Sequence, residues 1–361
     1  MGMLDFLVVG AGPSGSYVSA LLARKGYSVR IVDLKQDIGI PNHCSGLVDR
    51  RVVDIVGNDL VISKPSFAEI HTPTGSFTLT SDRMYVLDRV ALDKKLAGIA
   101  EADGVKIDKK TMLVGLSQND HSVKSFLSRG GRIEILESKY VIGADGPTSA
   151  TRRYLGIPKP RLLRSVQYDV KKRSDHVNIF MDRRKVPDFF AWEIPHDGET
   201  EIGASGTGSG DMVASIAAGQ QVVRKRGGLI PIGGIYPGSG NCYLVGDAAG
   251  MNKATTGGGL YGALISGKIL SETVSAGGNV KKYGKFLLDG FGREVKRALT
   301  IRNILDYTER HYKLWVPLVK SNIRGINRVG DVDYPSKAFL YVFASVPLRF
   351  PFIITDLIRT N

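Results

Sequence analysis

The sequence predicts an α/β fold that also contains α+β elements. Three features predict it: strand, glycine turn, helix and strand alternate over residues 5–33, short strands follow one another over residues 105–144, and the chain after residue 276 is helical. We therefore expect a Rossmann-like βαβ domain that carries a β-meander, a second domain built on a sheet, and a C-terminal helical region. The expected boundaries are residues 1–60, 84–157 and 240–275 for the first domain, 61–83 and 158–239 for the second, and 276–361 for the helical region.

The composition of the 361-residue chain excludes several other classes of protein. Its 15 prolines and 43 glycines stand in an otherwise balanced mixture, which excludes collagen and low-complexity disorder. The two cysteines, Cys44 and Cys242, cannot form a disulfide framework, and no cluster offers four metal ligands, so no metal is expected. The chain opens on a short strand and glycines rather than on a signal segment, which favours a cytoplasmic protein.

The first βαβ unit, Asp5–Asp33, contains the pattern Gly-x-Gly-x-x-Gly between its first strand and a helix expected over Ser16–Lys25. Gly10 permits the tight turn, Gly12 allows a pyrophosphate to approach the backbone, and Gly15 permits close packing of the helix on the strand. The helix N-terminus then faces the phosphates, and the acid 18 residues after Gly15 can accept hydrogen bonds from an adenosine ribose. The nucleotide contacts predicted here are Gly10, Gly12, Pro13, Ser14, Gly15, Asp33 and Leu34.

A β-meander is expected after the next helix, Arg89–Ala102. A meander at this place is unlike a nicotinamide dehydrogenase, in which strands and helices would continue to alternate. The last strand ends in an Asp-Gly-Pro turn, which predicts a second nucleotide contact through Asp145 and Gly146. The expected strands are Val105–Asp108, Met112–Ser117, Ser122–Leu127 and Arg132–Ala144.

A second strand-end acid, Asp247, follows an apolar strand and precedes three glycines and a helix of small residues, Tyr261–Val274. Glycines at a helix start expose backbone N–H groups to an anion or a polar ring; close helix packing is the alternative reason for them. One βαβ unit and two distant strand-end acids indicate a single extended dinucleotide held at both ends. FAD fits better than NAD, because its adenosine half can lie on Gly10–Asp33 and its ribityl and ring on Asp247–Leu260. A second Gly-x-Gly-x-x-Gly with a trailing acid is missing, so a separate nicotinamide domain is not expected. The contacts predicted for the flavin end are Asp247, Gly258, Gly259 and Leu260.

Residues 160–240 have a different pattern, with mixed polar and apolar strands such as Ser165–Val170 and Val177–Met181. Within this region the segment Pro187–Pro195 holds three aromatic residues between two prolines. A sheet that covers a pocket and an ordinary aromatic core strand explain this local pattern equally well.

The βαβ unit, the Asp-Gly turn and the Gly-Asp turn, in this order, resemble flavoproteins of the aromatic-hydroxylase-like fold over nearly the whole chain. A narrower resemblance is to the geranylgeranyl reductase family. The segment His43-Cys44-Ser45-Gly46-Leu47 is similar to that family's cysteine segment, and Pro187–Pro195 is similar to its substrate-pocket motif Pro-x-x-Tyr-x-Trp-x-Phe-Pro. Phe190 and Ile194 replace the Tyr and the Phe of this motif. Both are apolar, so a lipid pocket without the tyrosine hydroxyl is expected.

The resemblance implies FAD as the cofactor and reduction of isolated double bonds in geranylgeranyl chains. The cysteine segment and the Trp motif favour archaeal membrane-lipid precursors over pigment precursors as substrates. The implied electron donor is NAD(P)H or reduced ferredoxin, so a redox protein is a candidate partner. Arg89 resembles the family's FAD-contacting arginine; a surface cation is the alternative. The further FAD contacts are Cys44, Ser45, Leu47, Arg89 and Val114, and the substrate-pocket residues are Phe190, Trp192 and Pro195.

An isolated alkene has no carbonyl to accept charge, so its reduction needs a proton for one carbon and a hydride for the other, in a dry slot that aligns them. Cys44 is the acid that the motif places beside the flavin, and we expect it to be catalytic; a thiol that packs on the ring is the alternative. Two other functions stay open: a flavin monooxygenase of the same fold, and an electron-transfer flavoprotein that acts on a quinone.

The net charge of +14 is concentrated near the C-terminus, where residues 281–361 contain 15 Lys and Arg against 7 Asp and Glu. A polyanionic partner or a solvated helical face explains this surplus. Without a recognition motif, we expect no nucleic acid. The apolar run Ala338–Leu348 is too short to span a bilayer. It predicts peripheral contact with an anionic membrane at its inner face, unless it caps a helical core. The residues expected to insert are Phe339, Tyr341, Phe343 and Phe350.

Overall fold

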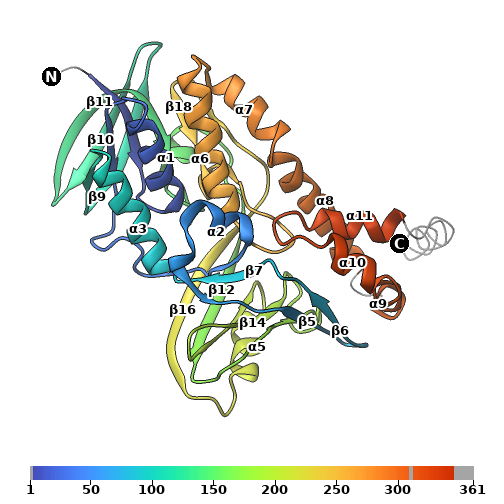
Figure 1. The fold of residues 1–361 in the computed structure, drawn as a ribbon. Helices are drawn as coiled ribbons and strands as arrows, with labels where there is room; N and C mark the ends of the chain where they lie inside the picture. Colours follow the sequence, from blue (N-terminus) through green and yellow to red (C-terminus); the bar gives the residue numbers. More distant parts are fainter. Residues whose placement is uncertain (1–2, 309–311, 345–361) are drawn as a thin grey trace.

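The computed structural model describes residues 3–308 and 312–344 (Figure 1). An eight-stranded sheet has the strand order β17–β18–β11–β1–β2–β8, with β10 and β9 attached through β11. β1 pairs in parallel with β2 and β11, as a βαβ unit requires, and β9, β10 and β11 pair antiparallel as a meander. The strands are β1 (Leu4–Val9), β2 (Val29–Val32), β8 (Lys106–Asp108), β9 (Thr111–Gln118), β10 (Val123–Arg129), β11 (Arg132–Gly143), β17 (Gly238–Ser239) and β18 (Cys242–Leu244).

Helices α1 (Pro13–Ala23), α3 (Arg89–Ala102) and α6 (Leu260–Ser275) pack beside one another against this sheet (Figure 1). Apolar side chains of β1, β2 and β11 form a core with those of α1 and α6. Helix α1 begins at Pro13, three residues before the predicted start at Ser16, because Gly12 is its N-cap and a proline fits the first helical position.

A seven-stranded sheet has the order β16–β12–β15–β14–β13–β5–β6, and helix α5 (Ser209–Ile216) packs on its central strands. Each neighbouring pair is antiparallel except β13 and β5. The predicted strands of residues 160–240 therefore exist. The strands are β5 (Phe67–Thr72), β6 (Gly75–Thr80), β12 (Arg161–Val170), β13 (Val177–Phe180), β14 (Ala191–Pro195), β15 (Thr200–Ser205) and β16 (Val222–Ile232).

A small third sheet has the order β3–β7–β4 and carries the chain that follows the predicted cysteine segment. Leu47 of β3 and Val86 of β7 pack with the apolar cluster of the seven-stranded sheet, whereas Val48 and Leu87 pack in a cluster with α2 and α3. The boundaries of the three predicted domains remain a prediction. The elements are β3 (Leu47–Asp49), α2 (Arg50–Val56), η1 (Asn58–Leu60), β4 (Val61–Ser63) and β7 (Met84–Leu87).

The described C-terminal part is helical, as predicted (Figure 1). The described residues of the helix expected over Glu294–Trp315 are helical and lie in α8 and α9, while residues 309–311 lie outside the described part of the chain. No helix of the described residues is long and apolar enough to cross a membrane. The helices are α7 (Val280–Asp289), α8 (Gly292–Thr308), α9 (Tyr312–Ser321), α10 (Ile323–Val329) and α11 (Ser336–Ala344), after a short α4 (Ala150–Tyr154) and η2 (Gly246–Ala249) earlier in the chain.

The turn between α10 and α11 fastens the C-terminal helices to the rest of the protein. The Arg51 guanidinium donates two hydrogen bonds of 2.8 Å to the Asp331 carboxylate. Lys253 Nζ, in the segment before α6, donates to Asp333 Oδ1 over 2.9 Å, and both side chains are buried. Tyr334 lies edge-on to Phe291, with ring centroids 5.5 Å apart. These contacts place the helical region next to the segment that leads into α6.

Candidate functional site

The glycine turn at the end of β1 is built from backbone atoms. A Cβ at Gly10 would lie 2.5 Å from Ala144 O, and one at Gly15 would lie 1.9 Å from Gly10 O, so neither position can hold a side chain. At Gly12, by contrast, no described atom lies within 4 Å of the Cβ position, and no described side chain caps α1. Space therefore adjoins the N-terminus of α1, where backbone N–H groups favour a phosphate.

Asp33 lies at the end of β2 and orders the same turn. Its Oδ2 accepts a hydrogen bond of 2.6 Å from the backbone N–H of Ala11, and its Oδ1 accepts one of 2.7 Å from that of Lys35. The next residue, Leu34, is 66% exposed, which leaves apolar surface beside the carboxylate. Val114 is the extra residue of a β-bulge in β9, since Gly115 pairs with Phe126 and Leu113 with Leu127. These features fit the adenosine end of a dinucleotide.

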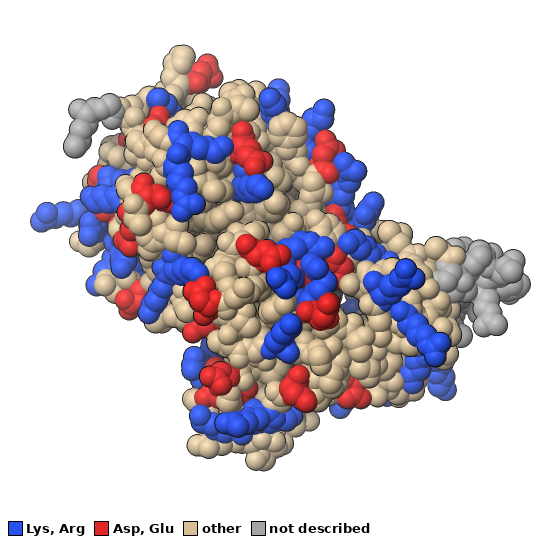
Figure 2. Space-filling model, viewed as in Figure 1, with Lys and Arg blue, Asp and Glu red and all other residues tan. Residues whose placement is uncertain are grey.

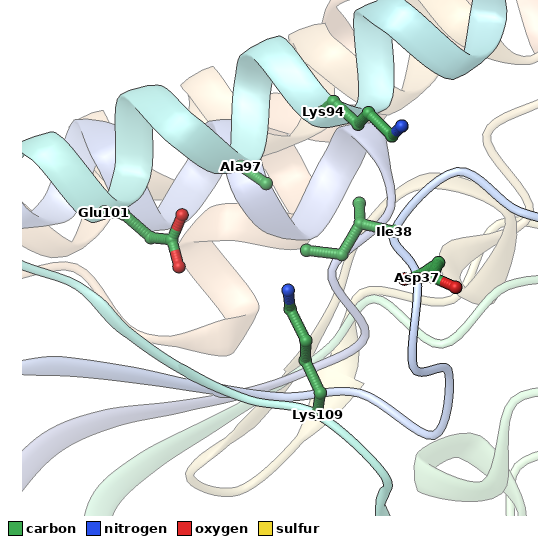
Figure 3. A pocket seen from close by; sticks show the side chains of 6 residues that line it. All are labelled: Asp37, Ile38, Lys94, Ala97, Glu101 and Lys109. Atoms are coloured by element: carbon green, nitrogen blue, oxygen red, sulfur yellow. The ribbon is translucent and has the colours of Figure 1, made fainter.

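A pocket of about 250 Å³ lies between α3 and the segments that follow β2 and β8 (Figure 3). Glu101 and Lys94 reach it from α3, and Lys109 points into it from the opposite side (Figure 3). Ile38 and Ala97 supply apolar lining. Both charge signs are present, and no residue of the predicted site lines it, so this pocket is not the predicted lipid pocket.

The strand-end acid Asp145 is engaged by its own turn. Its Oδ1 accepts a hydrogen bond of 2.5 Å from Ser149 Oγ, and its Oδ2 accepts bonds from the Thr151 N–H and hydroxyl at 2.9 and 3.0 Å. The carboxylate therefore holds the start of α4, a role that was not predicted from the sequence. Its neighbour Gly146 has a φ of +74° and no described atom within 4 Å of its Cβ position.

The other strand-end acid, Asp247, lies at the start of η2 and close to the glycines before α6. Its Oδ1 is 2.8 Å from the Cβ position of Gly259, so a side chain there would displace the carboxylate. Burial raises the pKa of Asp247 to about 6, although Arg89 and Arg152 act to lower it. Gly258 lies against the Lys253 side chain, and Leu260 is the first residue of α6. This side of the site thus combines a carboxylate with a helix N-terminus.

The side chains of Cys44 and Arg89 lie next to each other, close to Asp247. Cys44 is half-buried, and its backbone N–H donates to Asn42 Oδ1 over 3.0 Å. Burial alone would lower the pKa of the Arg89 guanidinium, but the neighbouring Cys44 and Asp93 outweigh it, so that pKa is raised. Arg89 Nη2 donates to Asp93 Oδ1 over 2.8 Å, while its buried Nε has no hydrogen-bond partner among the described residues. The structure therefore brings Cys44, Arg89 and Asp247 together.

The aromatic segment lies partly in β14. Trp192 is 6% exposed, and its ring is edge-on to that of Phe190, with centroids 5.9 Å apart. Side chains alternate along a strand, so Trp192 and Pro195, three positions apart in β14, lie on opposite faces of the sheet. The structure thus groups Phe190 with Trp192 and separates Pro195 from them.

The Cys44 segment rests on the face of the sheet that carries Trp192. Gln167 Nε2 donates to the His43 carbonyl over 3.5 Å, and Gln167, Gly203 and Trp192 pair directly across β12, β15 and β14. Residues directly opposite on neighbouring strands project to one face. His196 Nε2 lies 3.0 Å from the carbonyl oxygen of Ser45, which makes a second contact with the segment.

Sequence reasoning missed several polar residues of the site. Arg152, 2% exposed, bridges the two strand-end turns, because its guanidinium donates to the Pro147 and Ala248 carbonyls at 2.7 and 3.1 Å. Polar and charged residues within the strands, and a His directly after β14, were the available signal for the others, but their spacing does not show which of them come together. The other missed residues are Asp169, Gln167, His196, Glu201 and Arg226.

A backbone cradle at a helix N-terminus, an acid at the end of β2 and a second polar end across the sheet are the features of a dinucleotide-binding flavoprotein. The chain belongs to the FAD binding domain family, whose model matches residues 3–189, slightly more than half of its length. It is an FAD-dependent oxidoreductase.

Two curated relatives are digeranylgeranylglycerophospholipid reductases of archaea. The protein of Methanothrix thermoacetophila is 29% identical over 82% of this chain and 86% of its own length. The protein of Methanocella arvoryzae is 24% identical over 98% of each chain.

Solved structures share the fold. A geranylgeranyl bacteriochlorophyll reductase-like protein from Thermoplasma acidophilum matches with a TM-score of 0.81 and 20% identity over 99% of each chain. The p-nitrophenol 4-monooxygenase of Pseudomonas putida DLL-E4 matches with a TM-score of 0.71 and 16% identity, over 95% of this chain and 98% of that one.

Proposed function

We propose that this oxidoreductase saturates isolated double bonds of geranylgeranyl chains on archaeal membrane-lipid precursors. The observation that carries the proposal is the meeting of Cys44 and Arg89 beside Asp247, opposite the sheet face that holds Trp192. The names of the archaeal relatives support the substrate class. We also propose that the predicted FAD-contact residues hold the cofactor, with Asp145 acting through the turn that it orders.

Bound reduced FAD supplies a hydride. The Cys44 thiol gives its proton to one alkene carbon, and positive charge then develops on the more substituted carbon. The Arg89 guanidinium next to the sulfur stabilises the thiolate that remains, as a cation beside a thiolate does. Arg89 is held for this task by Asp93 on the same helix.

The sheet opposite Cys44 supplies an apolar surface for the prenyl chain. Trp192, Ile179 and Ile70 pair directly across β14, β13 and β5 and therefore project to one face. Phe190 packs on Trp192 without adding a hydroxyl to the slot. Such a surface excludes water from an alkene that has no polar group of its own.

The experiment for this proposal is anaerobic incubation of the dithionite-reduced holoprotein with a geranylgeranyl phospholipid, followed by mass spectrometry. Dithionite replaces the natural donor, for which NAD(P)H and reduced ferredoxin are the candidates. The expected result is product with two hydrogens gained per reduced double bond. Turnover with a quinone and none with the lipid would select an electron-transfer flavoprotein, and oxygen-dependent hydroxylation of an aromatic would select a monooxygenase.

We further propose that the C-terminal helices touch an anionic membrane from which the substrate is taken. Leu340 and Tyr341 of α11 are 53% and 37% exposed. Where Figure 1 draws α9 and α10, the charged residues that Figure 2 shows among the other residues are mainly Lys and Arg. The exposed basic residues of this surface are Lys313, Lys320, Arg324, Arg328 and Lys337. Phe350, like the predicted run beyond residue 344, lies outside the described residues.

Vesicle sedimentation tests this contact. Each basic residue near an anionic surface contributes about 1 kcal/mol, and salt screens it. We expect binding to anionic vesicles that falls as salt rises, and weaker binding after Lys320, Arg324 and Arg328 are changed to Gln. The control changes Lys106, Lys109 and Lys110 to Gln, which removes the same charge near β8. Equal binding to neutral vesicles, or equal loss in both variants, would contradict the contact.

A further inference from the structure

The seven-stranded sheet carries two rows of side chains on the face that meets the Cys44 segment. Arg226, Gln167, Gly203 and Trp192 form one row across β16, β12, β15 and β14. Asp169 and Glu201 pair in the next row, two residues along, and so project to the same face. A surface expected to receive a prenyl chain therefore also contains a buried polar group.

Trp192 is fixed in this face by two independent contacts. Its indole lies over Gly203, where a Cβ would be only 2.3 Å from the ring, so any other residue would displace it. Its Nε1–H donates to Glu201 Oε1 over 2.9 Å. Glu201 is completely buried, so this bond is shielded from water. The ring orientation depends on Glu201 as well as on the glycine.

Glu201 also connects Trp192 to the Cys44 segment. Gln167 Nε2 donates to Glu201 Oε1 over 3.4 Å and to the His43 carbonyl over 3.5 Å. Arg226 Nη2 donates to Glu201 Oε2 over 2.7 Å and also to Asp169. A continuous chain of hydrogen bonds thus runs from the indole to the residue before Cys44.

The stability of the sheet does not by itself explain this network. Asp169, Glu201, Arg226 and Gln167 are all buried, and removing charges from water is unfavourable even when they are paired. Gln167 Oε1 and the Nε and Nη1 of Arg226 have no hydrogen-bond partner within the described part of the chain. A well-packed apolar set would serve stability as well. The retained charges therefore point to a task in the site.

We propose that Glu201 is a positioning residue, which holds the Trp192 indole over Gly203 and, through Gln167, holds the Cys44 segment against the same face. The purpose of this role rests on the proposed function: Glu201 sets the position of the Cys44 acid relative to the apolar sheet face that carries Trp192. The contacts themselves are independent of the substrate.

The test uses the FAD-loaded protein labelled with 5-fluorotryptophan. The chain has two tryptophans, so a Trp315→Phe variant assigns the ¹⁹F resonance of Trp192. The second readout is the alkylation rate of Cys44 by iodoacetamide, because Cys242, the other cysteine, is fully buried. Neither readout involves a prenyl substrate, so failure of this inference and failure of the proposed function are distinguishable.

Glu201→Gln keeps the shape of the side chain and removes its charge. We expect the Trp192 resonance to shift or broaden and the Cys44 alkylation rate to change severalfold. Gln167→Met leaves the bond between Glu201 and Trp192 intact, so only the alkylation rate is expected to change. Glu193→Gln is the matched control: Glu193 is also buried in β14, but it projects to the opposite face and bonds Lys172 and Asn178.

A Trp192 resonance unmoved by Glu201→Gln, or a Cys44 rate unchanged in both Glu201→Gln and Gln167→Met, would overturn the proposal. Equal effects of Glu193→Gln would also overturn it, because they would show a general response to loss of a buried charge. If Glu201→Gln fails to fold, Gln167→Met still decides the connection to Cys44, and Gly203→Ala decides whether the indole position affects the alkylation rate.

Discussion

The two large sheets build their parts of the site in opposite ways. In the eight-stranded sheet the cofactor cradle consists of backbone, and Gly10 and Gly15 stand where a Cβ would meet a backbone oxygen. In the seven-stranded sheet the candidate site contains buried charged side chains such as Glu201 and Arg226. The backbone cradle is disrupted when a side chain is added to one of its glycines. The group of buried charges is disrupted when one of its hydrogen-bonding partners is removed.

The largest effect expected is that of an added methyl group in the cradle. In Gly15→Ala the Cβ would lie 1.9 Å from Gly10 O, so we expect a loss of at least about 3 kcal/mol of stability with or without FAD. Gly12→Ala meets no described atom within 4 Å, so it should keep the stability of the FAD-free protein and lower its affinity for FAD. Thermal unfolding and flavin titration of both variants separate the two effects; equal behaviour would contradict a backbone-built cradle.

The second effect concerns the charge of Asp247. Its pKa is raised to about 6 in the fold from 3.8, so the folded protein binds the proton more tightly than the unfolded chain between these values. This group therefore lowers stability as pH rises from about 4 to about 6. In FAD-free protein, Asp247→Asn should gain on the order of 3 kcal/mol relative to wild type over that range. Urea unfolding at pH 4 and 7 measures this gain, and a constant difference would contradict it.

The third effect concerns Asp33. Its side chain accepts a hydrogen bond from the backbone of the glycine turn, so this contact joins a charged side chain to the backbone cradle. Asp33→Ala removes the bond to Ala11 and the expected bonds to the ribose, each of which contributes about 1–3 kcal/mol when a charged group takes part. Asp33→Asn keeps one acceptor and should lose less FAD affinity. Flavin retention on dilution measures both, and wild-type retention in Asp33→Ala would remove Asp33 from the site.

The cradle could be predicted because its information is local. Gly10, Gly12, Gly15 and Asp33 lie within one βαβ unit, and spacing alone fixes their arrangement. The meander and the helical tail were likewise predictable from short-range periodicity. The start of α1 was predicted three residues late because Gly12, and not Gly15, is the N-cap.

The polar network could not be predicted, because it depends on strand register. Gln167, Glu201 and Arg226 come from three strands, and only the pairing of those strands brings them together. The face of the sheet to which Pro195 projects could likewise not be predicted, because it depends on the bounds of β14. For Asp145, a Ser and a Thr soon after it were a local sign of the turn in which its carboxylate is engaged.

The most direct test of the account is a single-turnover measurement with the Cys44→Ser variant. Reduced holoprotein is mixed anaerobically with a geranylgeranyl phospholipid, and flavin absorbance follows reoxidation while mass spectrometry follows the product. We expect wild-type protein to reoxidise with saturation of the lipid. Cys44→Ser should keep its bound-flavin spectrum and react about 10²–10⁴-fold more slowly, because a hydroxyl is a much weaker acid than a thiol. An unchanged rate would assign Cys44 to packing, and no reoxidation by the lipid in wild type would contradict the proposed function.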